Sequence, residues 1–424
     1  MNKIKQTKEY LKQQYLADTR PWVVTFSGGK DSTVVLQLVI EMLIELQQEK
    51  LDTKDVYVVT SDTFVEMPVI EKYMHDILAK IDTFAKQQKL KLYTNLLTPK
   101  VEESFWSLML GKGYPAPNQW FRWCTDRMKI RPATLFLSSL VDKHQSILML
   151  LGVRSAESDS RAQSIASREL NHRDLTMHEQ IPNAFILSPI KDWSNEAVWS
   201  YLGSHQAPWG NHDTMMSLYD KGSGEADCNV ALNPEAPSCG KTRFGCWVCT
   251  VVDKDRSMEG MISSGEKWMQ PLDSYRVKLK AYRDDETKRA TRKRDGRRGI
   301  GPFLLEVRKE LLKELLSIEK EIDHQLIRDD EIIQIQKFWD DDGDIENSAL
   351  NMALKFNRCQ EYQIETKQIK KYLDEFGDDI VDKKLFERIY EIEKYRKNIS
   401  NRYKISEDIR NRAMSYYKGA YSEN

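Results

Sequence analysis

The sequence has few histidines and lacks a long apolar run. Seven of its 424 residues are histidine, and none are spaced as paired ligands, so we do not expect a histidine-rich metal site. A membrane-spanning helix needs roughly 20 consecutive apolar residues, and no such run is present. A basic stretch followed by an apolar one, as in a signal peptide, is also missing. These absences predict a cytoplasmic protein with no membrane partner.

The chain also lacks a net charge of either sign. Its 64 Lys and Arg residues are balanced by 65 Asp and Glu residues, and the formal net charge is −1. A nucleic-acid surface would therefore have to be a local patch. Between Arg276 and Arg298, eleven basic residues stand against four acidic ones, a local charge of +7. Most charge runs are solvated faces, but this concentration favours contact with a polyanion such as nucleic acid.

Disulfide bonds are not expected, because the cytosol keeps thiols reduced. The chain has six cysteines, and four of them lie within 22 positions: Cys228, Cys239, Cys246 and Cys249. A Cys-x2-Cys pair such as Cys246 and Cys249 places two thiolates on one metal, and two further cysteines complete four ligands. The spacing predicts an iron–sulfur or a zinc site, because the number of thiolates does not distinguish the two.

One stretch, residues 22–33, is the centre of the predicted fold. Residues 22–26 are β-branched or aromatic, which is typical of a buried strand, and a polar turn with Gly28 and Gly29 follows. A helix is then predicted by apolar residues at helical spacing: Val35, Leu38, Val39, Met42, Leu43 and Leu46. Glycines let the backbone approach an anion, and the helix N-terminus offers N–H groups. The pattern predicts a phosphate-binding loop, in which we expect Lys30 to be solvated.

Strands alternate with helices along the first part of the chain. The sequence predicts strands at 56–60, 90–95 and 147–151 and a helix over 69–88. This alternation is typical of an α/β fold, a parallel sheet with helices on both faces. Ligands bind at the carboxyl ends of such strands. From composition we expect three parts, which are residues 1–215 around the sheet, residues 216–300 with the cysteine-rich segment and basic run, and residues 301–424 as a helical C-terminal region.

Two further segments carry candidate chemistry. Cys124 is surrounded by basic residues in F-R-W-C-T-D-R-M-K-I-R, which would favour its thiolate and attract phosphate. The alternative is a surface loop with a buried structural cysteine. After the strand at 147–151, Arg154 and Arg161 with Glu157 suit a second anion-binding edge, and the alternative there is a solvated loop.

Residues 27–32, Ser-Gly-Gly-Lys-Asp-Ser, resemble the PP-loop of the ATP pyrophosphatases. With C-T-x-x-x-K-I-x-P, G-V-R-x-x-E-S-x-x-R-A and P-I-x-D-W-S-x-x-x-V-W, residues 22–202 are similar to the phosphoadenosine-phosphosulfate reductase branch of that group. The resemblance implies an adenine-nucleotide-alpha-hydrolase-like fold and attack on the α-phosphate of ATP, with Mg²⁺ and release of pyrophosphate. It implies a nucleotide site made of Ser27, Gly28, Gly29, Lys30, Asp31, Ser32, Asp62, Thr63, Gly152 and Arg154.

Further blocks, including P-S-C-G-x-x-R-F-G-C-W-V-C-T-V-V, resemble the DndC family, the PP-loop sulfurtransferases of bacterial DNA phosphorothioation. This resemblance covers about residues 20–302. It implies ATP-dependent transfer of sulfur to the DNA backbone, with DNA, a cysteine desulfurase as sulfur donor and other phosphorothioation proteins as partners. It also implies a [4Fe-4S] cluster on Cys239, Cys246 and Cys249, with Cys124 or Cys228 as the fourth ligand. The catalytic residues that it implies are Lys30, Asp31, Cys124 and Arg154.

Two other functions stay open. One is reduction of a sulfonucleotide, which is disfavoured because the sequence lacks a C-terminal catalytic cysteine motif and Cys359 is predicted to lie within a helix. The other is a non-catalytic assembly subunit that binds nucleotide and cluster and regulates its partners.

Overall fold

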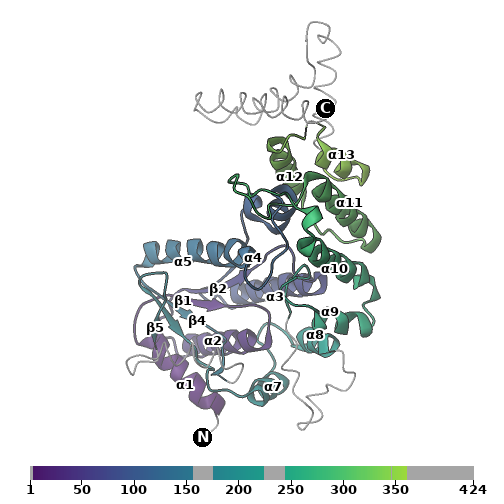
Figure 1. Ribbon diagram of the computed structural model, residues 1–424. Coiled ribbons are helices and arrows are strands. Elements are labelled where there is room, and N and C mark those ends of the chain that lie inside the picture. Colours follow the sequence, from purple (N-terminus) through teal and green to yellow (C-terminus); the bar gives the residue numbers. More distant parts are fainter. Residues whose placement is uncertain (1–2, 156–174, 224–243, 345, 361–424) are drawn as a thin grey trace, which may run out of the picture. The chain divides into compact units, whose positions relative to one another are not determined.

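The computed structural model describes residues 3–155, 175–223, 244–344 and 346–360. The chain divides into two compact units, unit 1 with residues 1–99 and 118–273 and unit 2 with residues 100–117 and 274–424. Figure 1 shows the elements of both. The division differs from the three parts expected from composition, because residues 100–117 join the later helices and residues 216–273 join the first unit.

Unit 1 contains a sheet of six described strands in the order β3-β2-β1-β4-β6-β5. The strands are β1 (Trp22–Thr25), β2 (Val56–Ser61), β3 (Leu92–Leu97), β4 (Ile147–Leu150), β5 (Thr176–Met177) and β6 (Ala184–Leu187). Neighbouring strands are parallel except β5, which pairs antiparallel with β6. The four predicted strands are confirmed to within about two residues, whereas β5 and β6 were not predicted.

Helices cover both faces of this sheet. In unit 1 they are α1 (Lys3–Leu16), α2 (Lys30–Gln48), α3 (Pro68–Gln87), α4 (Trp123–Thr125), α5 (Arg131–His144), α7 (Asn195–Ser204), α8 (Asp213–Ser223) and α9 (Arg256–Ser263), with the short turns η3 (Asp126–Ile130) and η5 (Lys267–Met269). Figure 1 shows α5 on the opposite side of the strands from α1 and α2. The predicted α/β fold with a mostly parallel, doubly covered sheet is therefore confirmed.

The central strands are apolar on both faces, as a doubly covered sheet requires. Val23 of β1 and Met149 of β4 belong to one buried cluster with Leu137 of α5. Trp22 and Val24, the alternate residues of β1, are also fully buried. Burial on both sides is the reason why β1 reads as an unbroken run of β-branched and aromatic residues.

The strand order reverses between β1 and β4. From β1 the sheet continues through β2 to β3 in one direction, and the chain then returns to place β4 on the other side of β1. Trp22 pairs with Leu148 and Val24 with Leu150, so the carboxyl ends of the two strands lie at the same level. In doubly wound sheets this reversal point opens the crevice where ligands bind.

Unit 2 is mainly helical over its described residues, apart from a hairpin at residues 289–303. Its elements are η1 (Val101–Glu103), η2 (Ser107–Gly111), α10 (Gln270–Asp284, which starts in unit 1), η6 (Glu286–Lys288), α11 (Leu305–Ile322), α12 (Asp329–Asp341) and α13 (Ser348–Lys355). Trp106 donates its indole N–H to the carbonyl of Leu326 at 2.8 Å, and Trp339 donates to the carbonyl of Leu110 at 2.7 Å. These bonds attach residues 100–117 to the later helices. Residues 361–424 of the expected C-terminal region lie outside the described residues.

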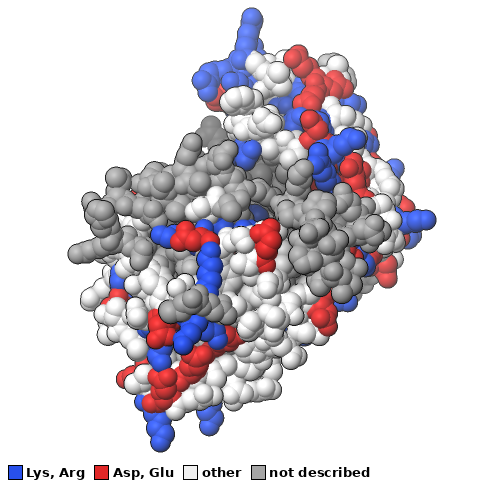
Figure 2. All heavy atoms as spheres, turned by 90° about the horizontal axis from the view of Figure 1, so that it is seen from below, with Lys and Arg blue, Asp and Glu red and all other residues white. Residues whose placement is uncertain are grey.

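The described surface carries charges of both signs. On the face drawn in Figure 2, basic and acidic side chains are interspersed, in keeping with the net charge of −1. No helix in the described part of the chain is long and apolar enough to cross a membrane.

Candidate functional site

The PP-loop, residues 27–32, joins the carboxyl end of β1 to the N-terminus of α2. Gly28 has φ = +72°, and a Cβ at this position would lie 3.1 Å from Cε1 of Tyr73, so both backbone and space favour glycine. Gly29 is the N-cap of α2, and glycine has no side chain to accept the first N–H groups of the helix. The positive end of the α2 dipole therefore lies at the point where the strand order reverses, which suits an anion.

Hydroxyl groups stabilise the shape of the loop. The Oγ of Ser32 accepts the backbone N–H of Ser27 at 3.2 Å and donates to the carbonyl of Gly29 at 2.9 Å. The Oγ of Thr33 donates to the same carbonyl at 2.9 Å. Because these bonds close within the loop, the hydroxyl groups of Ser32 and Thr33 stabilise its conformation.

Asp31 lies between two cations. Its Oδ1 accepts the Nε–H of Arg154 at 2.6 Å, and its Oδ2 lies 3.2 Å from Nζ of Lys30. The expectation of a solvated Lys30 was wrong, because Lys30 is the first residue of α2 and is only 7% exposed. Its Nζ lies 5.6 Å from the ring centre of Tyr219, which helps to cover it. Two cations beside one carboxylate give this part of the site a net positive charge, which suits phosphate.

Gly152, which follows β4, packs directly on the PP-loop. A Cβ at Gly152 would lie 2.7 Å from the backbone N of Ser32 and 2.9 Å from the carbonyl carbon of Asp31. No side chain fits in that space. Gly152 therefore allows the end of β4 to touch the start of α2, and this contact brings Arg154 to Asp31.

A cavity of about 910 Å³ lies over the PP-loop at the reversal point. It is lined by eight of the ten residues predicted for the nucleotide site: Ser27, Gly28, Gly29, Lys30, Asp31, Ser32, Gly152 and Arg154. Its volume is within the range of about 300–1,000 Å³ that is typical of small-molecule sites. The structure thus brings together two predicted anion-binding segments that are more than 100 residues apart in the sequence.

The other two predicted residues, Asp62 and Thr63, do not line the cavity formed by the described residues. Ser61 and Glu66 line it instead. The chain turns after β2 through Phe64, whose φ is +61°. Thr63 is then held away from the cavity, with its Oγ1 2.7 Å from Oε2 of Glu66 and 3.5 Å from Sγ of Cys246.

Three of the described cysteines lie close to the turn that follows β2. Cys246 forms an isolated antiparallel bridge with Glu66, and the N–H of Cys249 donates to the carbonyl of Cys246 at 3.0 Å. Cys124 lies in α4, near enough for its charge to act on Cys246 and for the charge of Cys249 to act on it. Cys228 and Cys239 lie outside the described residues.

Lys129 connects the cysteines to the cavity. It lines the cavity, and its pKa is raised, first by the charge of Cys246 and also by Glu66, Cys124 and Cys249. Burial raises the pKa of the Cys246 thiol to about 12 and also raises that of Cys124. Without a bound cation these thiols stay protonated at neutral pH, and a metal would bind their thiolate forms with release of protons.

This donor set fits a thiolate-bound metal centre. Cys124 and Cys246, which come from two segments of the chain, lie within electrostatic reach of each other, and burial disfavours the free thiolate of both. Iron–sulfur clusters and structural zinc both bind four thiolates. Cys124 stays a candidate ligand, and iron and zinc stay alternatives.

Several cavity residues were not predicted. Tyr73 comes from α3 and Tyr219 from α8, and no local sequence pattern marks them as site residues, whereas Lys129 of η3 is the lysine of the C-T-x-x-x-K-I-x-P motif. Asn195 and Glu196 could have been found, because they follow Ser194 in one of the motifs that resemble the reductase branch. Ser194 is confirmed as the N-cap of α7, its Oγ accepting the N–H of Ala197 at 3.2 Å.

The family model of the phosphoadenosine phosphosulfate reductase domain matches residues 21–252, more than half of the chain. Two uncharacterized proteins of Methanocaldococcus jannaschii are similar, MJ0066 with 27% identity over 272 residues and MJ0973 with 28% over 214 residues. These matches cover 63% and 50% of this chain, and 45% and 42% of the relatives. The chain therefore spans less than half the length of these curated relatives.

Two of the solved structures that match show distant likeness to this chain. Candida glabrata FMN adenylyltransferase in complex with FMN and an ATP analog has a TM-score of 0.31 and 14% identity, covering 53% of this chain and 60% of that one. The U34-tRNA thiolase NcsA of Methanococcus maripaludis, with its [4Fe-4S] cluster, has a TM-score of 0.28 and 10% identity, covering 66% and 78%. Likeness at this level carries no argument about the present chain.

Proposed function

Because the chain belongs to the phosphoadenosine phosphosulfate reductase domain family, we propose that it is an ATP-dependent sulfurtransferase of DNA phosphorothioation. In this proposal a backbone phosphate of DNA is activated with ATP and one non-bridging oxygen is replaced by sulfur. The motifs that resemble the DndC family support the choice of DNA as substrate. Cysteine desulfurase and other phosphorothioation proteins are the partners that this function requires.

One observation supports the proposal most strongly, and it is the composition of the cavity wall. The same cavity is lined by the PP-loop and by Lys129 and Glu66, and both of these residues interact with Cys246. An enzyme that activates a phosphate and then sulfurates it needs both chemistries at one place. The position of the PP-loop beside two residues that interact with Cys246 supports the proposal.

The order of the two chemical steps follows from the need for a good leaving group on the DNA phosphate. Oxide cannot leave a phosphodiester, so the DNA phosphate oxygen first attacks the α-phosphate of ATP and pyrophosphate leaves. A cysteine desulfurase delivers sulfur as a persulfide, which a thiol reductant converts to the sulfide level with formation of a disulfide. This sulfide-level nucleophile then displaces AMP, which carries away the original oxygen. The PP-loop N–H groups and Lys30 would stabilise the charge that develops on pyrophosphate, with Mg²⁺ entering as the ATP complex.

Cys239, Cys246 and Cys249 would hold the iron–sulfur cluster, with Cys124 as the fourth ligand and Cys228 as the alternative. A bound cluster would supply a thiolate-anchored site for the sulfur that is transferred. The protein residues around it have separate tasks. Lys129 provides a positive charge for the approaching phosphate, and Arg154 keeps Asp31 in place through its 2.6 Å ion pair.

The sulfonucleotide reductase alternative receives no support from Cys359. The prediction that Cys359 lies within a helix was wrong, because α13 ends at Lys355 and Cys359 follows with φ = +55°. Its side chain is buried, and burial raises the pKa of the thiol to about 12. Such a thiol is a poor nucleophile at neutral pH.

The proposed function is tested by two product measurements. The anaerobically purified protein should convert ATP to AMP and pyrophosphate, and DNA from cells that carry the intact gene should contain phosphorothioate linkages detectable by mass spectrometry. Cells that carry the Lys30→Ala gene should lack these linkages. Formation of ADP and phosphate would contradict the PP-loop chemistry, and no nucleotide turnover in the presence of DNA and sulfur donor would favour the assembly-subunit alternative.

The basic run expected to contact DNA is divided in the structure. The side chains of its first part take part in packing and ion pairs within the protein. Arg276 is buried in α10, and Nζ of Lys278 lies 2.8 Å from Oε1 of Glu310. Its second part is a hairpin closed by antiparallel bridges between Arg289 and Phe303 and between Arg292 and Arg298. Residues 291–300 of this hairpin are all exposed. The proposed DNA contact is therefore the hairpin rather than the whole run.

Replacing Arg292, Lys293 and Arg298 together with glutamine should weaken DNA binding. These three side chains form no ion pair with any described residue, so their charges are available to phosphates. The slope of log affinity against log salt should fall by about 0.9 for each duplex phosphate contact removed. Arg297→Gln is the matched control, because Asp295 already neutralises that arginine. An unchanged slope in the triple variant would exclude the hairpin as the DNA contact.

A further inference from the structure

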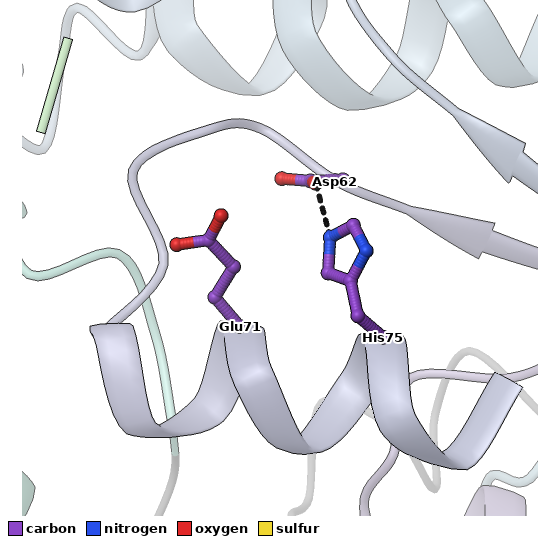
Figure 3. Close-up of side chains that lie close together, drawn as sticks. All are labelled: Asp62, Glu71 and His75. Carbon is purple, nitrogen blue, oxygen red and sulfur yellow. Dashed lines mark hydrogen bonds and ion pairs between the residues drawn. The ribbon is translucent and has the colours of Figure 1, made fainter. Parts of the chain in front are cut away.

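We propose that Asp62, Glu71 and His75 form a site for a divalent first-row transition-metal cation, separate from the nucleotide cavity and from the cysteines. The ligand atoms of the three side chains all lie within 4.8 Å of one another. Figure 3 shows Glu71 and His75 extending from successive turns of α3 toward Asp62, which follows the end of β2.

The backbone explains why the three side chains meet. Glu71 and His75 are four residues apart on α3 and so lie on one face of the helix. Asp62 is fixed opposite that face, because its Oδ1 accepts the N–H of Phe64 at 2.8 Å. Its Oδ2 lies 3.0 Å from Nε2 of His75, the contact drawn as a dashed line in Figure 3. One oxygen thus orients the carboxylate and the other faces the imidazole.

The chemistry of the three donors suits a transition-metal ion. Two carboxylates and one imidazole match the preferences of Mn²⁺, Fe²⁺, Co²⁺ and Zn²⁺. Two carboxylates this close repel each other, and a shared cation removes the repulsion. The Asp62 side chain is 4% exposed and the His75 side chain 47% exposed, so the cluster has one buried wall and one side open to solvent. Water would complete the coordination from the open side.

This cluster is not part of the nucleotide cavity. The α3 residues that line the cavity are Ile70, Tyr73 and Met74, and none of the three proposed ligands is among them. The ion would instead fix the turn that follows β2, which carries Thr63 next to Cys246. We assign the ion a structural role in that turn.

Binding of Mn²⁺ tests the proposal, because Mn²⁺ prefers carboxylate over thiolate ligands. Titration of the full-length protein without nucleotide, followed by the EPR signal of free Mn²⁺, should show one saturable site. His75→Ala and Glu71→Gln should each weaken binding by about tenfold or more, because loss of even an outer-shell partner costs about 10–100-fold. Mn²⁺ should also raise the melting temperature of the wild type and not that of His75→Ala.

Asp76→Asn is the matched control, because Asp76 is an exposed acidic residue of α3 outside the cluster. It should bind Mn²⁺ like the wild type. Circular dichroism should show that His75→Ala is folded, as expected for a half-exposed side chain. Absence of a saturable site in the wild type, or equal affinity of the wild type and His75→Ala, would overturn the proposal. Since no ATP or DNA is present, neither result depends on the proposed sulfurtransferase activity.

Discussion

Lys30→Ala should lower the rate of pyrophosphate release from ATP by about 10²–10³-fold, the effect of removing one preorganised charge-stabilising donor. The fold should survive the change. Asp31 keeps its 2.6 Å ion pair with Arg154 when Lys30 is removed, so no buried carboxylate is left without a partner. The rate is measured by coupled detection of pyrophosphate, and folding by the melting temperature.

Lys86→Ala provides the control for this measurement. Lys86 lies near the end of α3, and its side chain is 75% exposed and pairs with Asp82. The same substitution there should leave the rate unchanged. If Lys30→Ala retained the wild-type rate, the PP-loop lysine would have no part in the chemistry. If it lost its cooperative melting transition, the role of Lys30 would be structural.

Replacement of a cysteine ligand is expected to cause a similarly large loss, in this case of the iron–sulfur cluster. Protein purified without oxygen should be brown and contain about four iron atoms per chain if a [4Fe-4S] cluster is present. Cys124→Ser should remove the colour as completely as Cys246→Ser, because the structure places Cys124 within electrostatic reach of both Cys246 and Cys249. Iron analysis and the visible absorption spectrum report the result.

Two further variants sharpen this test. Cys359→Ser should keep its iron, because Cys359 is buried in unit 2 among other partners, with its N–H directed to Asp329. Cys228→Ser should also keep its iron if Cys124 is the ligand. Iron retained in Cys124→Ser and lost in Cys228→Ser would reverse the assignment of the fourth ligand. Zinc without iron under strict exclusion of air would select the zinc alternative.

The sequence predicted the parts of the fold that carry their own pattern. β1, β2 and β4 are runs of apolar residues that are buried on both faces, and Gly28 of the PP-loop is required by its positive φ. β6 is short and follows directly on residues of a turn, so no periodicity separates it from its neighbours. The burial of Lys30 could not be predicted either, because it depends on Tyr219, 189 residues away.

The residues of the candidate site were also predicted only in part from the sequence. Gly28, Gly29 and Gly152 were predicted from motifs, and each has a steric reason in the structure. The contact of Thr63 with Cys246 spans 183 residues, and it arises only when the cysteine segment pairs with the turn after β2. Glu66 enters the site through this pairing. Sequence patterns record local geometry, and these residues are placed by tertiary contacts.

The course of the chain between the two units restricts how this protein can be divided. The chain leaves unit 1 after residue 99, returns at residue 118 and leaves again after residue 273. A fragment that ends at residue 273 would retain residues 100–117 without their partners. Trp106 and Leu110, both buried in the intact protein, would then be exposed to water, and the indole of Trp106 would lose the carbonyl of Leu326. Exposed aromatic and aliphatic surface of this kind promotes aggregation. A fragment that contains unit 1 alone therefore has to omit residues 100–117 as well as the residues after 273.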